Sequence, residues 1–287
     1  MFRKKLEIRE HAGAIYSLAF DGQFVYSASA DHYVTRWNIE TGIQDKFAIR
    51  FDKPVYTIHT EKSRLFAGCN NGDLHVFDLQ SRQEVKFFTQ HRAAIFSMCV
   101  NSRVNHFYAG DAEGNLSIWD IDTLKLLSFL PLGCGKIRDI GLSESNEHIL
   151  IAAANGQLIL LESNTLNEVD RFLAHNEACT SVLSFDDQVL TGGKDAYLRL
   201  WSSGGEMIKA IPAHLFAVYR LIDMNGSLIS ASRDKTIKVW TKNLELIQRL
   251  DAESGGHSHS VNDIISISKD AFVSCSDDRR IIIWETN

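Results

Sequence analysis

The sequence predicts an all-β fold built as a radial array of seven four-stranded sheets. A large apolar residue recurs along the chain, at Trp37, Phe77, Trp119, Leu161, Trp201, Trp240 and Trp284. The spacings, obtained by subtracting these numbers, are 40, 42, 42, 40, 39 and 44 residues, and seven repeats of 41 account for all 287 residues. A period in the forties, with short strand-like runs and polar turns, is typical of such arrays. One repeat of about 40 residues buries too little apolar surface to be stable alone, so neighbouring repeats must complete each core.

Each repeat is expected to contribute strands in a fixed order. The first is apolar, as in residues 14–20 (AIYSLAF) and 94–100 (AIFSMCV). Two further runs, rich in β-branched and aromatic residues, follow, and the third ends at the recurring apolar position. A fourth and more polar run, as in residues 43–50 and 84–90, is expected to be the outer edge strand.

The two ends of the chain predict how the array is completed. The seventh repeat has no fourth run, because the sequence ends three residues after Trp284. Residues 4–11 (KKLEIREH) are strand-like and precede the first repeat, where the other repeats carry an outer strand. We therefore expect residues 3–9 to pair with the third strand of the last repeat, which removes an open sheet edge. We assign residues 1–287 to one domain.

The best repeats resemble a known family. Their sequences are SASADHYVTRW at 27–37, LTGGKDAYLRLW at 190–201, ISASRDKTIKVW at 229–240 and VSCSDDRRIIIW at 273–284. These segments resemble the WD-repeat family of β-propellers, and the resemblance extends over essentially the whole chain. It implies a seven-bladed β-propeller of four-stranded antiparallel blades, with the ring closed by the N-terminal strand pairing with the last repeat.

Four residue types recur at fixed spacing in four repeats: a His at the start, a Ser or Thr ten residues before the Trp, an Asp six before it, and the Trp itself. The resemblance implies that each quartet is a hydrogen-bonded chain from the indole N–H through the hydroxyl and the His to the Asp. A catalytic Ser-His-Asp set needs to occur once, so we interpret the fourfold recurrence as structural. The quartets are His11, Ser27, Asp31 and Trp37; His175, Thr191, Asp195 and Trp201; His214, Ser230, Asp234 and Trp240; and His257, Ser274, Asp278 and Trp284.

Repeats two, three and four depart from this pattern. Repeat three keeps His91 and Trp119 but has Ala109 and Glu113 at the other two positions. Repeats two and four lack the His and carry Phe77 and Leu161 in place of the Trp. We therefore expect blades two to four to lack the complete polar chain and to form the softer half of the molecule.

Composition and motifs favour a non-enzymatic cytoplasmic protein. The formal net charge is −6, and no apolar run approaches the 18 residues of a membrane span. Five cysteines, an odd number, suit reduced thiols. We find no motif of a phosphate loop, hydrolase or metalloenzyme and expect no cofactor and no metal. The HNEAC run at 175–179 lacks the PCxxC of zinc deaminases, and in GGHSHS at 255–260 His257 already belongs to a quartet.

The resemblance also implies a partner site on the face that carries the His-containing and Asp-containing loops. The position five residues after each repeat's His reads Tyr16, Tyr56, Phe96, Arg138, Thr180, Tyr219 and Asn262 around the array. Two further positions, three residues after the His and just before the turn Asp, add Lys136, Lys194 and Arg233. Aromatic residues and Arg dominate interface hot spots. The predicted partner-binding residues are Tyr16, Tyr56, Phe96, Lys136, Arg138, Lys194, Tyr219 and Arg233. The alternative is that these side chains merely cover the channel rim.

The function predicted from these features is a protein–protein interaction scaffold that binds a peptide or partner domain over the central channel mouth. One alternative is single-stranded nucleic-acid binding by aromatic stacking, and another is a propeller enzyme. The acidic balance and the absence of a Lys/Arg-rich tract argue against nucleic acid. The expected partners are one or more proteins or peptides, with no membrane, and the sequence does not identify them.

Overall fold

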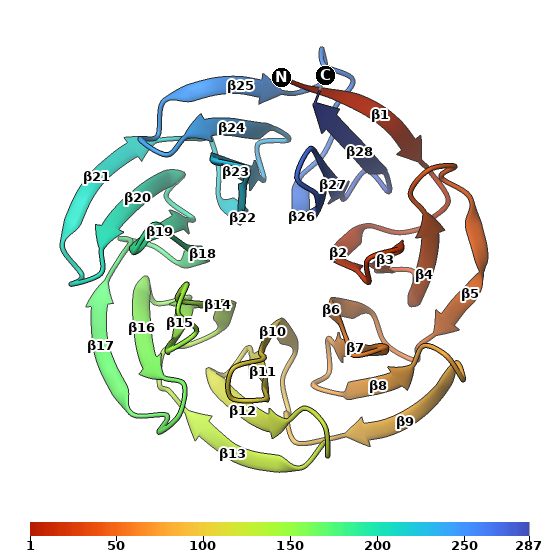
Figure 1. The fold of residues 1–287 in the computed structure, drawn as a ribbon, viewed down its shortest axis with the longest axis horizontal. Coiled ribbons are helices and arrows are strands. Elements are labelled where there is room, and N and C mark those ends of the chain that lie inside the picture. The colour runs from red at the N-terminus through yellow and green to blue at the C-terminus, as the bar shows by residue number, and fades with distance from the viewer. Residues whose placement is uncertain (287) are drawn as a thin grey trace. The chain divides into compact units, whose positions relative to one another are not determined.

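The computed structural model describes residues 1–286, which contain strands and turns but no helix. Within that range, 28 strands form seven four-stranded sheets, which we call blades one to seven (Figure 1). The predicted fold class, an all-β seven-bladed β-propeller of four-stranded antiparallel blades, is confirmed. In the described part of the chain no helix is long and apolar enough to cross a membrane.

The chain divides into two compact units, Met1–Asn70 with Leu74–Phe87 and Tyr219–Asn287, and Asn71–Asp73 with Phe88–Val218. The prediction that residues 1–287 form a single domain stays a prediction. Blades six, seven, one and two belong to the first unit, apart from a turn and two terminal strand residues, and blades three, four and five belong to the second.

In the first unit the blades follow one another in the order six, seven, one and two (Figure 1). Blade six has β22 (Val218–Met224), β23 (Ser227–Ser232), β24 (Ile237–Thr241) and β25 (Leu246–Leu250). Blade seven has β26 (Val261–Ser268), β27 (Ala271–Ser276), β28 (Ile281–Thr286) and β1 (Phe2–Ile8). Blade one has β2 (Ile15–Phe20), β3 (Phe24–Ser29), β4 (Tyr33–Asn38) and β5 (Gln44–Arg50). Blade two has β6 (Val55–Glu61), β7 (Arg64–Cys69), β8 (Leu74–Asp78) and β9 (Gln83–Phe88).

In the second unit the order is three, four and five. Blade three has β10 (Ile95–Asn101), β11 (His106–Asp111), β12 (Asn115–Asp120) and β13 (Leu126–Pro131). Blade four has β14 (Ile137–Leu142), β15 (His148–Ala153), β16 (Gln157–Glu162) and β17 (Glu168–Leu173). Blade five has β18 (Cys179–Phe185), β19 (Gln188–Gly193), β20 (Tyr197–Ser202) and β21 (Met207–Pro212).

Burial differs sharply between the strands of a blade. The second strand is buried from its second residue to its last, as in β3, β11 and β19. A strand covered on both faces has no polar face to present, which is why these strands read as continuous apolar and small-residue runs. The fourth strand is mostly exposed, as in β9 and β21. It is the polar outer strand that the sequence predicted.

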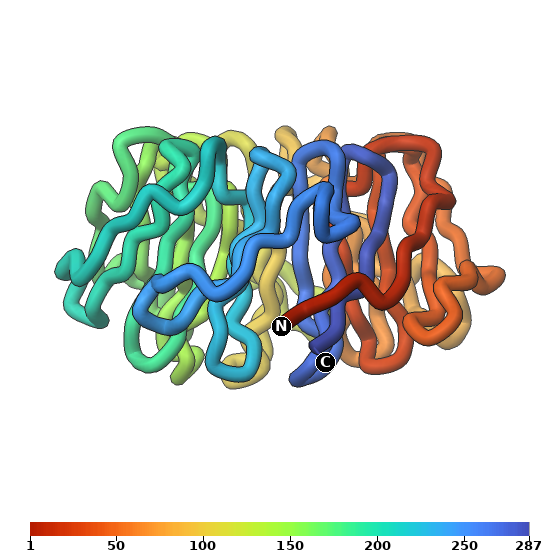
Figure 2. The backbone as a smooth tube through the Cα atoms, turned by 90° about the horizontal axis from the view of Figure 1, so that it is seen from above, coloured from red at the N-terminus to blue at the C-terminus, as the bar shows by residue number. Residues whose placement is uncertain are grey.

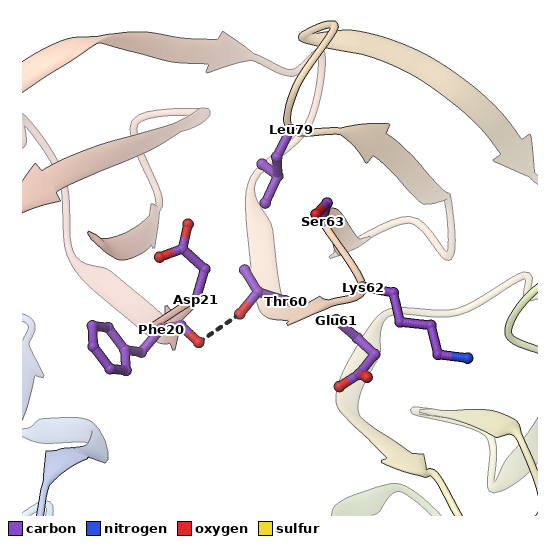
Figure 3. Close-up of a pocket in the computed structure, with 7 residues that line it drawn as sticks. All are labelled: Phe20, Asp21, Thr60, Glu61, Lys62, Ser63 and Leu79. Atoms are coloured by element: carbon purple, nitrogen blue, oxygen red, sulfur yellow. Dashed lines mark hydrogen bonds between the residues drawn. The ribbon is translucent and has the colours of Figure 1, made fainter. Parts of the chain in front are cut away.

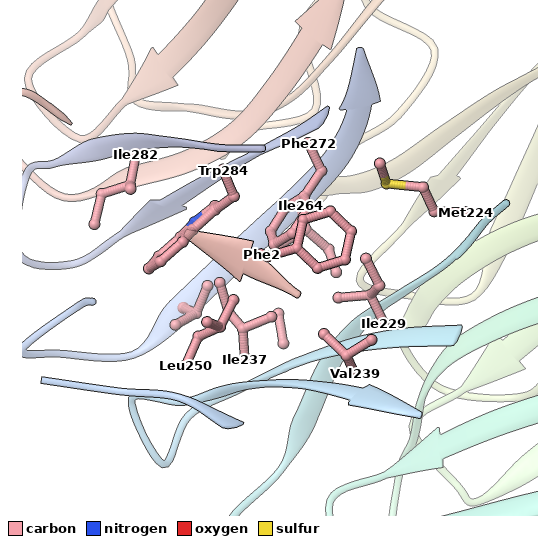
Figure 4. Close-up of a cluster of buried hydrophobic side chains, with 12 residues drawn as sticks. Phe2, Met224, Ile229, Ile237, Val239, Leu250, Ile264, Phe272, Ile282 and Trp284 are labelled. Carbon is pink, nitrogen blue, oxygen red and sulfur yellow. The ribbon is translucent and has the colours of Figure 1, made fainter. Parts of the chain in front are cut away.

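The N-terminal strand completes blade seven, as predicted. Strand β1 pairs antiparallel with β28, so that the two ends of the described chain lie side by side (Figure 2). Phe2 is buried and meets Phe272 edge-on, with ring centroids 4.9 Å apart (Figure 4). The guanidinium of Arg280, the residue before β28, lies 3.3 Å from the carboxylate of Glu7 in β1. Ladder, core and ion pair therefore all hold the first strand in place.

The hydrophobic cores lie between neighbouring blades. The cluster in Figure 4 takes Ile229 and Val239 from blade six and Ile264 and Trp284 from blade seven. Equivalent clusters join blade seven to one, one to two, three to four, and four to five. Each of these cores needs two blades, so one repeat does not bury a core alone.

Candidate functional site

The predicted positions five residues after each repeat's His lie at the start of the inner strands, six of them on β-bulges. In blade one, Ile15 faces Ser29 and Ser17 faces Ala28, which leaves Tyr16 outside the ladder. The same break leaves out Tyr56, Phe96, Arg138, Thr180 and Asn262 in their blades. Tyr219 is likewise the second residue of its inner strand, β22. A bulge releases one residue from pairing and redirects its side chain, so a single backbone feature, repeated blade after blade, produces the periodic positions read from the sequence.

Two of these residues form an aromatic pair in the first unit. The rings of Tyr16 and Tyr56 meet edge to face, with centroids 5.1 Å apart and planes at 85°. Both are half-buried. Burial, followed by the nearby Tyr56 and Asp277, raises the pKa of Tyr16, so its hydroxyl stays protonated at neutral pH. The amide of Asn262 donates to the backbone oxygen of Ile15 and to Asp277, both at 2.8 Å. The aromatic pair therefore lies beside a fixed carboxylate.

A second group, the cationic cluster, lies in the second unit and consists of Phe96, Lys136 and Arg138. The Nζ of Lys136 is 4.1 Å from the centroid of the Phe96 ring, and the Cζ of Arg138 is 5.4 Å from it. All three residues are half-buried. Cations over an aromatic face are attracted by the ring quadrupole. This cluster therefore presents two cations, whereas the aromatic pair lies beside a carboxylate.

The remaining predicted partner residues have different surroundings. Lys194 is exposed and pairs with Glu177 at 2.8 Å. Arg233 is exposed, and Tyr219 is half-buried. The bulge position of blade five is not a surface feature, because the Thr180 hydroxyl is buried and donates to the backbone oxygen of Gly192 at 2.9 Å.

The structure brings together all four members of the polar quartets in blades one, five and seven. In blade one, the Trp37 indole donates to Ser27 Oγ at 2.7 Å, Ser27 Oγ lies 2.7 Å from His11 Nε2, and His11 Nδ1 lies 2.8 Å from Asp31. Blades five and seven have the same connections, from Trp201 through Thr191 and His175 to Asp195, and from Trp284 through Ser274 and His257 to Asp278. In blade six the Trp240 indole donates to Ser230 at 2.9 Å, His214 is buried, and Asp234 accepts from the Thr236 N–H at 3.0 Å.

Blade three has a complete polar chain, so the prediction that it lacks one is wrong. His91 Nδ1 lies 2.7 Å from Asp111 and His91 Nε2 lies 2.7 Å from Ser117, whose Oγ accepts the Trp119 indole N–H at 2.8 Å. The hydroxyl comes from the third strand because Ser117 faces Ala109 directly in the ladder. A hydroxyl from either strand therefore reaches the same point. The sequence does contain this hydroxyl, as Ser117 two residues before Trp119. A search for a Ser or Thr ten residues before the Trp does not find it.

Blades two and four pack differently. Phe51 stands where blade one has its His, four residues before the inner strand, and its ring lies 5.1 Å from His75 and 5.7 Å from Phe77. An aromatic cluster thus takes the place of the polar chain in blade two. In blade four Leu161 packs in an aliphatic core that includes Ile149 and Ile159.

The quartets are polar networks enclosed within the blades. Burial would raise the pKa of Asp31, but hydrogen bonds from His11 and two backbone N–H groups lower it to about 2. Burial lowers the pKa of His175 to about 4, which keeps the imidazole neutral at pH 7. The hydroxyls of Ser27, Thr191 and Ser274 belong to fully buried residues. A nucleophile must reach a substrate, and these hydroxyls are enclosed between strands.

Two buried carboxylates that the sequence did not single out link neighbouring blades. Asp139 in blade four accepts the Val182 N–H of blade five at 3.0 Å, and Asp263 in blade seven accepts the Leu18 N–H of blade one at 2.9 Å. Both are less than a tenth exposed. The inner strands carry a polar residue at this position in every repeat: Ser17, Thr57, Ser97, Asp139, Ser181, Arg220 and Asp263. That recurrence was the available signal.

A small cavity of about 240 Å³ lies in the first unit at the far ends of β2 and β6 (Figure 3). Its lining is Phe20, Asp21, Thr60, Glu61, Lys62, Ser63 and Leu79. The Thr60 hydroxyl donates to the Phe20 oxygen at 2.9 Å, and Asp21 accepts the Phe24 N–H at 2.7 Å. The predicted partner residues do not line this cavity. Within residues 1–286 no group of three or more His, Cys, Asp or Glu side chains is placed to hold a metal.

Comparison with known proteins gives one family. The family model described as "WD domain, G-beta repeat" matches residues 2–38, 82–120, 166–202, 205–241 and 246–285, more than half of the chain. The matches cover repeats one, three, five, six and seven. The unmatched repeats, two and four, are those in which aromatic or aliphatic packing replaces the polar chain.

Similar individual proteins are more distant. An uncharacterized WD repeat-containing protein of Schizosaccharomyces pombe is 24% identical over 79% of this chain and 65% of its own length. A U3 snoRNP-associated protein-like protein of Arabidopsis thaliana is 22% identical over 67% of this chain and 44% of its own length. WD repeat-containing protein 55 of the same plant is 22% identical over 91% of this chain and 76% of its own length. The chain thus spans less than two thirds of the length of the first two relatives.

Proposed function

The chain belongs to the WD-repeat family of β-propellers, and from that premise we propose that it is a non-enzymatic scaffold that binds a peptide or a partner domain through the bulge residues of its inner strands. One observation carries this proposal. The bulges release aromatic and cationic side chains from the ladders of successive blades, and these side chains contact one another across blades, Tyr16 with Tyr56 and Phe96 with Arg138.

The chemistry of these side chains suits recognition. Tyr supplies a large, amphipathic contact area with few rotatable bonds, Arg supplies a planar group with several donors, and truncation of either is among the changes that most weaken interfaces. Their mutual packing orders them before a partner arrives, which reduces the entropic cost of binding. The Ser-His-Asp groups, in contrast, lie inside the blades and are engaged with one another.

Affinity capture with a double variant tests the proposal. Phe96→Ala together with Arg138→Ala should weaken capture of partners from the native cell lysate at least tenfold, about 1.4 kcal/mol, with little change in the thermal unfolding midpoint. The control is Lys269→Ala, in the turn at the other end of an inner strand, which should leave capture unchanged. If the double variant captures as much partner as the wild type, while Lys269→Ala captures less, the partner site lies elsewhere.

A second candidate is single-stranded nucleic-acid binding by aromatic stacking. It is favoured by the relative named as U3 snoRNP-associated protein-like and by the half-buried tyrosines of the aromatic pair. Phosphate contacts release counterions, so nucleic-acid affinity falls steeply with salt. A salt titration of binding to a fluorescent single-stranded RNA, beside the same titration for a captured protein partner, separates the two candidates.

The cytoplasmic location also stays a proposal, supported by the composition and the five free thiols. Imaging of the tagged protein in its native cell tests it, and a signal confined to the nucleus would contradict it.

A further inference from the structure

The cationic cluster has an unusual arrangement of charge. Lys136 and Arg138 flank Ile137, whose side chain is fully buried in blade four. Lys136 precedes β14 and Arg138 is the residue that the bulge releases from the ladder, and both cations lie against the ring of Phe96 from blade three. Two like charges are thus held side by side on a half-buried surface, where water screens them less than at a fully exposed one.

The carboxylate of Asp139, next to Arg138 in the sequence, accepts hydrogen bonds from backbone N–H groups. Asp139, the next residue, is 3% exposed and accepts the Val182 N–H at 3.0 Å and its own strand's Ile140 N–H at 3.1 Å. Among residues 1–286, no carboxylate oxygen lies within 4.0 Å of Lys136 Nζ. Lys194, in comparison, has Glu177 at 2.8 Å. Burial and the charge of Arg138 lower the pKa of Lys136, the direction expected when a cation is crowded by another and gains no compensating anion.

We propose that Lys136 and Arg138, lying over Phe96, form a subsite for one aspartate or glutamate side chain of a partner peptide. This inference rests on the proposed function, since it names the chemistry that the scaffold recognises. The Arg138 guanidinium presents the planar fork that pairs with a carboxylate, and Lys136 adds a point charge. The ring of Phe96 holds both cations from behind and so orders them before the anion arrives.

A peptide selection tests the inference without a known partner. A random dodecapeptide library on phage is selected on the wild type and on the Lys136→Gln/Arg138→Gln variant. Peptides from the wild type should be enriched in Asp and Glu at least threefold over the library, and the variant should give no such enrichment. Lys125→Gln, an exposed lysine in the turn before β13, should select the same acidic peptides as the wild type. Equal unfolding midpoints show that the variants are folded.

Titration then assigns the contact. A fluorescent selected peptide and its Glu→Gln or Asp→Asn counterpart are titrated against the wild type and the double variant. The peptide substitution alone, or the double variant alone, should weaken binding about tenfold. The two combined should weaken binding little more, because each already removes the same contact. Phe96→Leu should weaken binding about threefold.

The outcomes distinguish this inference from the proposal beneath it. Full additivity, or selected peptides without acidic enrichment, overturns the carboxylate subsite. If the selected peptides lack acidic enrichment but Tyr16→Ala abolishes their binding, the scaffold proposal stands. If no peptide binds and no partner is captured, the scaffold proposal falls with it. A phosphoserine peptide that binds more tightly than its glutamate counterpart overturns the assignment to a carboxylate.

Discussion

At the scale of single residues, the polar chain within a blade is defined by a point in space and not by a sequence position. In blades one, five and seven the hydroxyl comes from the second strand, and in blade three it comes from Ser117 of the third. Both reach the point between the imidazole and the indole because the two positions face each other in the ladder. A fixed spacing therefore recognises only one of two equivalent solutions.

This equivalence predicts a rescue. Ser117→Ala should lower the free energy of unfolding by about 1–3 kcal/mol, because the buried His91 and Trp119 ring nitrogens lose their partner. Adding Ala109→Ser should recover at least half of the lost free energy of unfolding, because it supplies the hydroxyl from the facing strand. Urea unfolding measures both, with Ser102→Ala as an exposed control in the same blade. A double variant no more stable than Ser117→Ala would show that the two strand positions are not interchangeable.

The buried histidines make stability depend on pH. Burial lowers the pKa of His175 to about 4, against 6.5 for an unperturbed histidine, and burial and Arg220 lower that of His59 to about 4. Between these values the unfolded chain binds protons that the folded protein does not, so the free energy of unfolding decreases as pH falls from 6.5 towards 4. The loss for His175 is roughly 2–3 kcal/mol.

Urea unfolding at a series of pH values across this window measures the effect. His175→Gln lowers stability at neutral pH but removes one titrating group, so its free energy of unfolding should fall less steeply with decreasing pH than that of the wild type. Parallel curves for the two proteins would contradict this assignment.

At the scale of elements, strand β1 shows what the sequence could predict and what it could not. Its existence and pairing follow from the missing fourth strand of the last repeat. Its bounds, Phe2–Ile8, begin one residue before the predicted range of 3–9. That one residue matters, because Phe2 supplies the aromatic ring of β1 that packs into the core between blades six and seven. The bulges could not be predicted either, since the repeat spacing identified the periodic positions but not the break in strand pairing that exposes them.

Strand β1 should therefore contribute most through its first residues. Phe2→Ala should lower the free energy of unfolding by about 3 kcal/mol, because it leaves a cavity against Phe272. Arg3→Ala, at an exposed neighbouring position, should change it by less than about 0.5 kcal/mol. Deletion of residues 1–9 should in addition expose the edge of β28 and promote aggregation. Thermal unfolding and light scattering measure these effects, and a monomeric truncation with an unchanged midpoint would show that β1 is dispensable.

At the scale of the whole molecule, the repeat period was enough to predict seven blades, the strand order and the packing of each core between neighbours. Those features depend on hydrophobic pattern, which the sequence displays directly. The contents of individual blades were harder to predict, because a polar chain, an aromatic cluster around Phe51 and an aliphatic core around Leu161 all fill the same place. The partner residues were found as positions, whereas their contacts, such as two cations over one ring, depend on side-chain packing between blades that repeat spacing does not encode.

Because the blades differ inside, local stability should alternate from blade one to blade five, with blades two and four the softer ones. The polar chain ties the loop before the inner strand to the second and third strands, and such networks resist local opening. Each unit offers a matched comparison: blade one against blade two, and blade three against blade four. Amide hydrogen exchange followed by mass spectrometry should be slower in β3 and β4 than in β7 and β8, and slower in β11 and β12 than in β15 and β16. If β11 and β12 exchange as fast as β15 and β16, while Ser117→Ala leaves their rates unchanged, the polar chain does not set blade stability and apolar packing alone suffices.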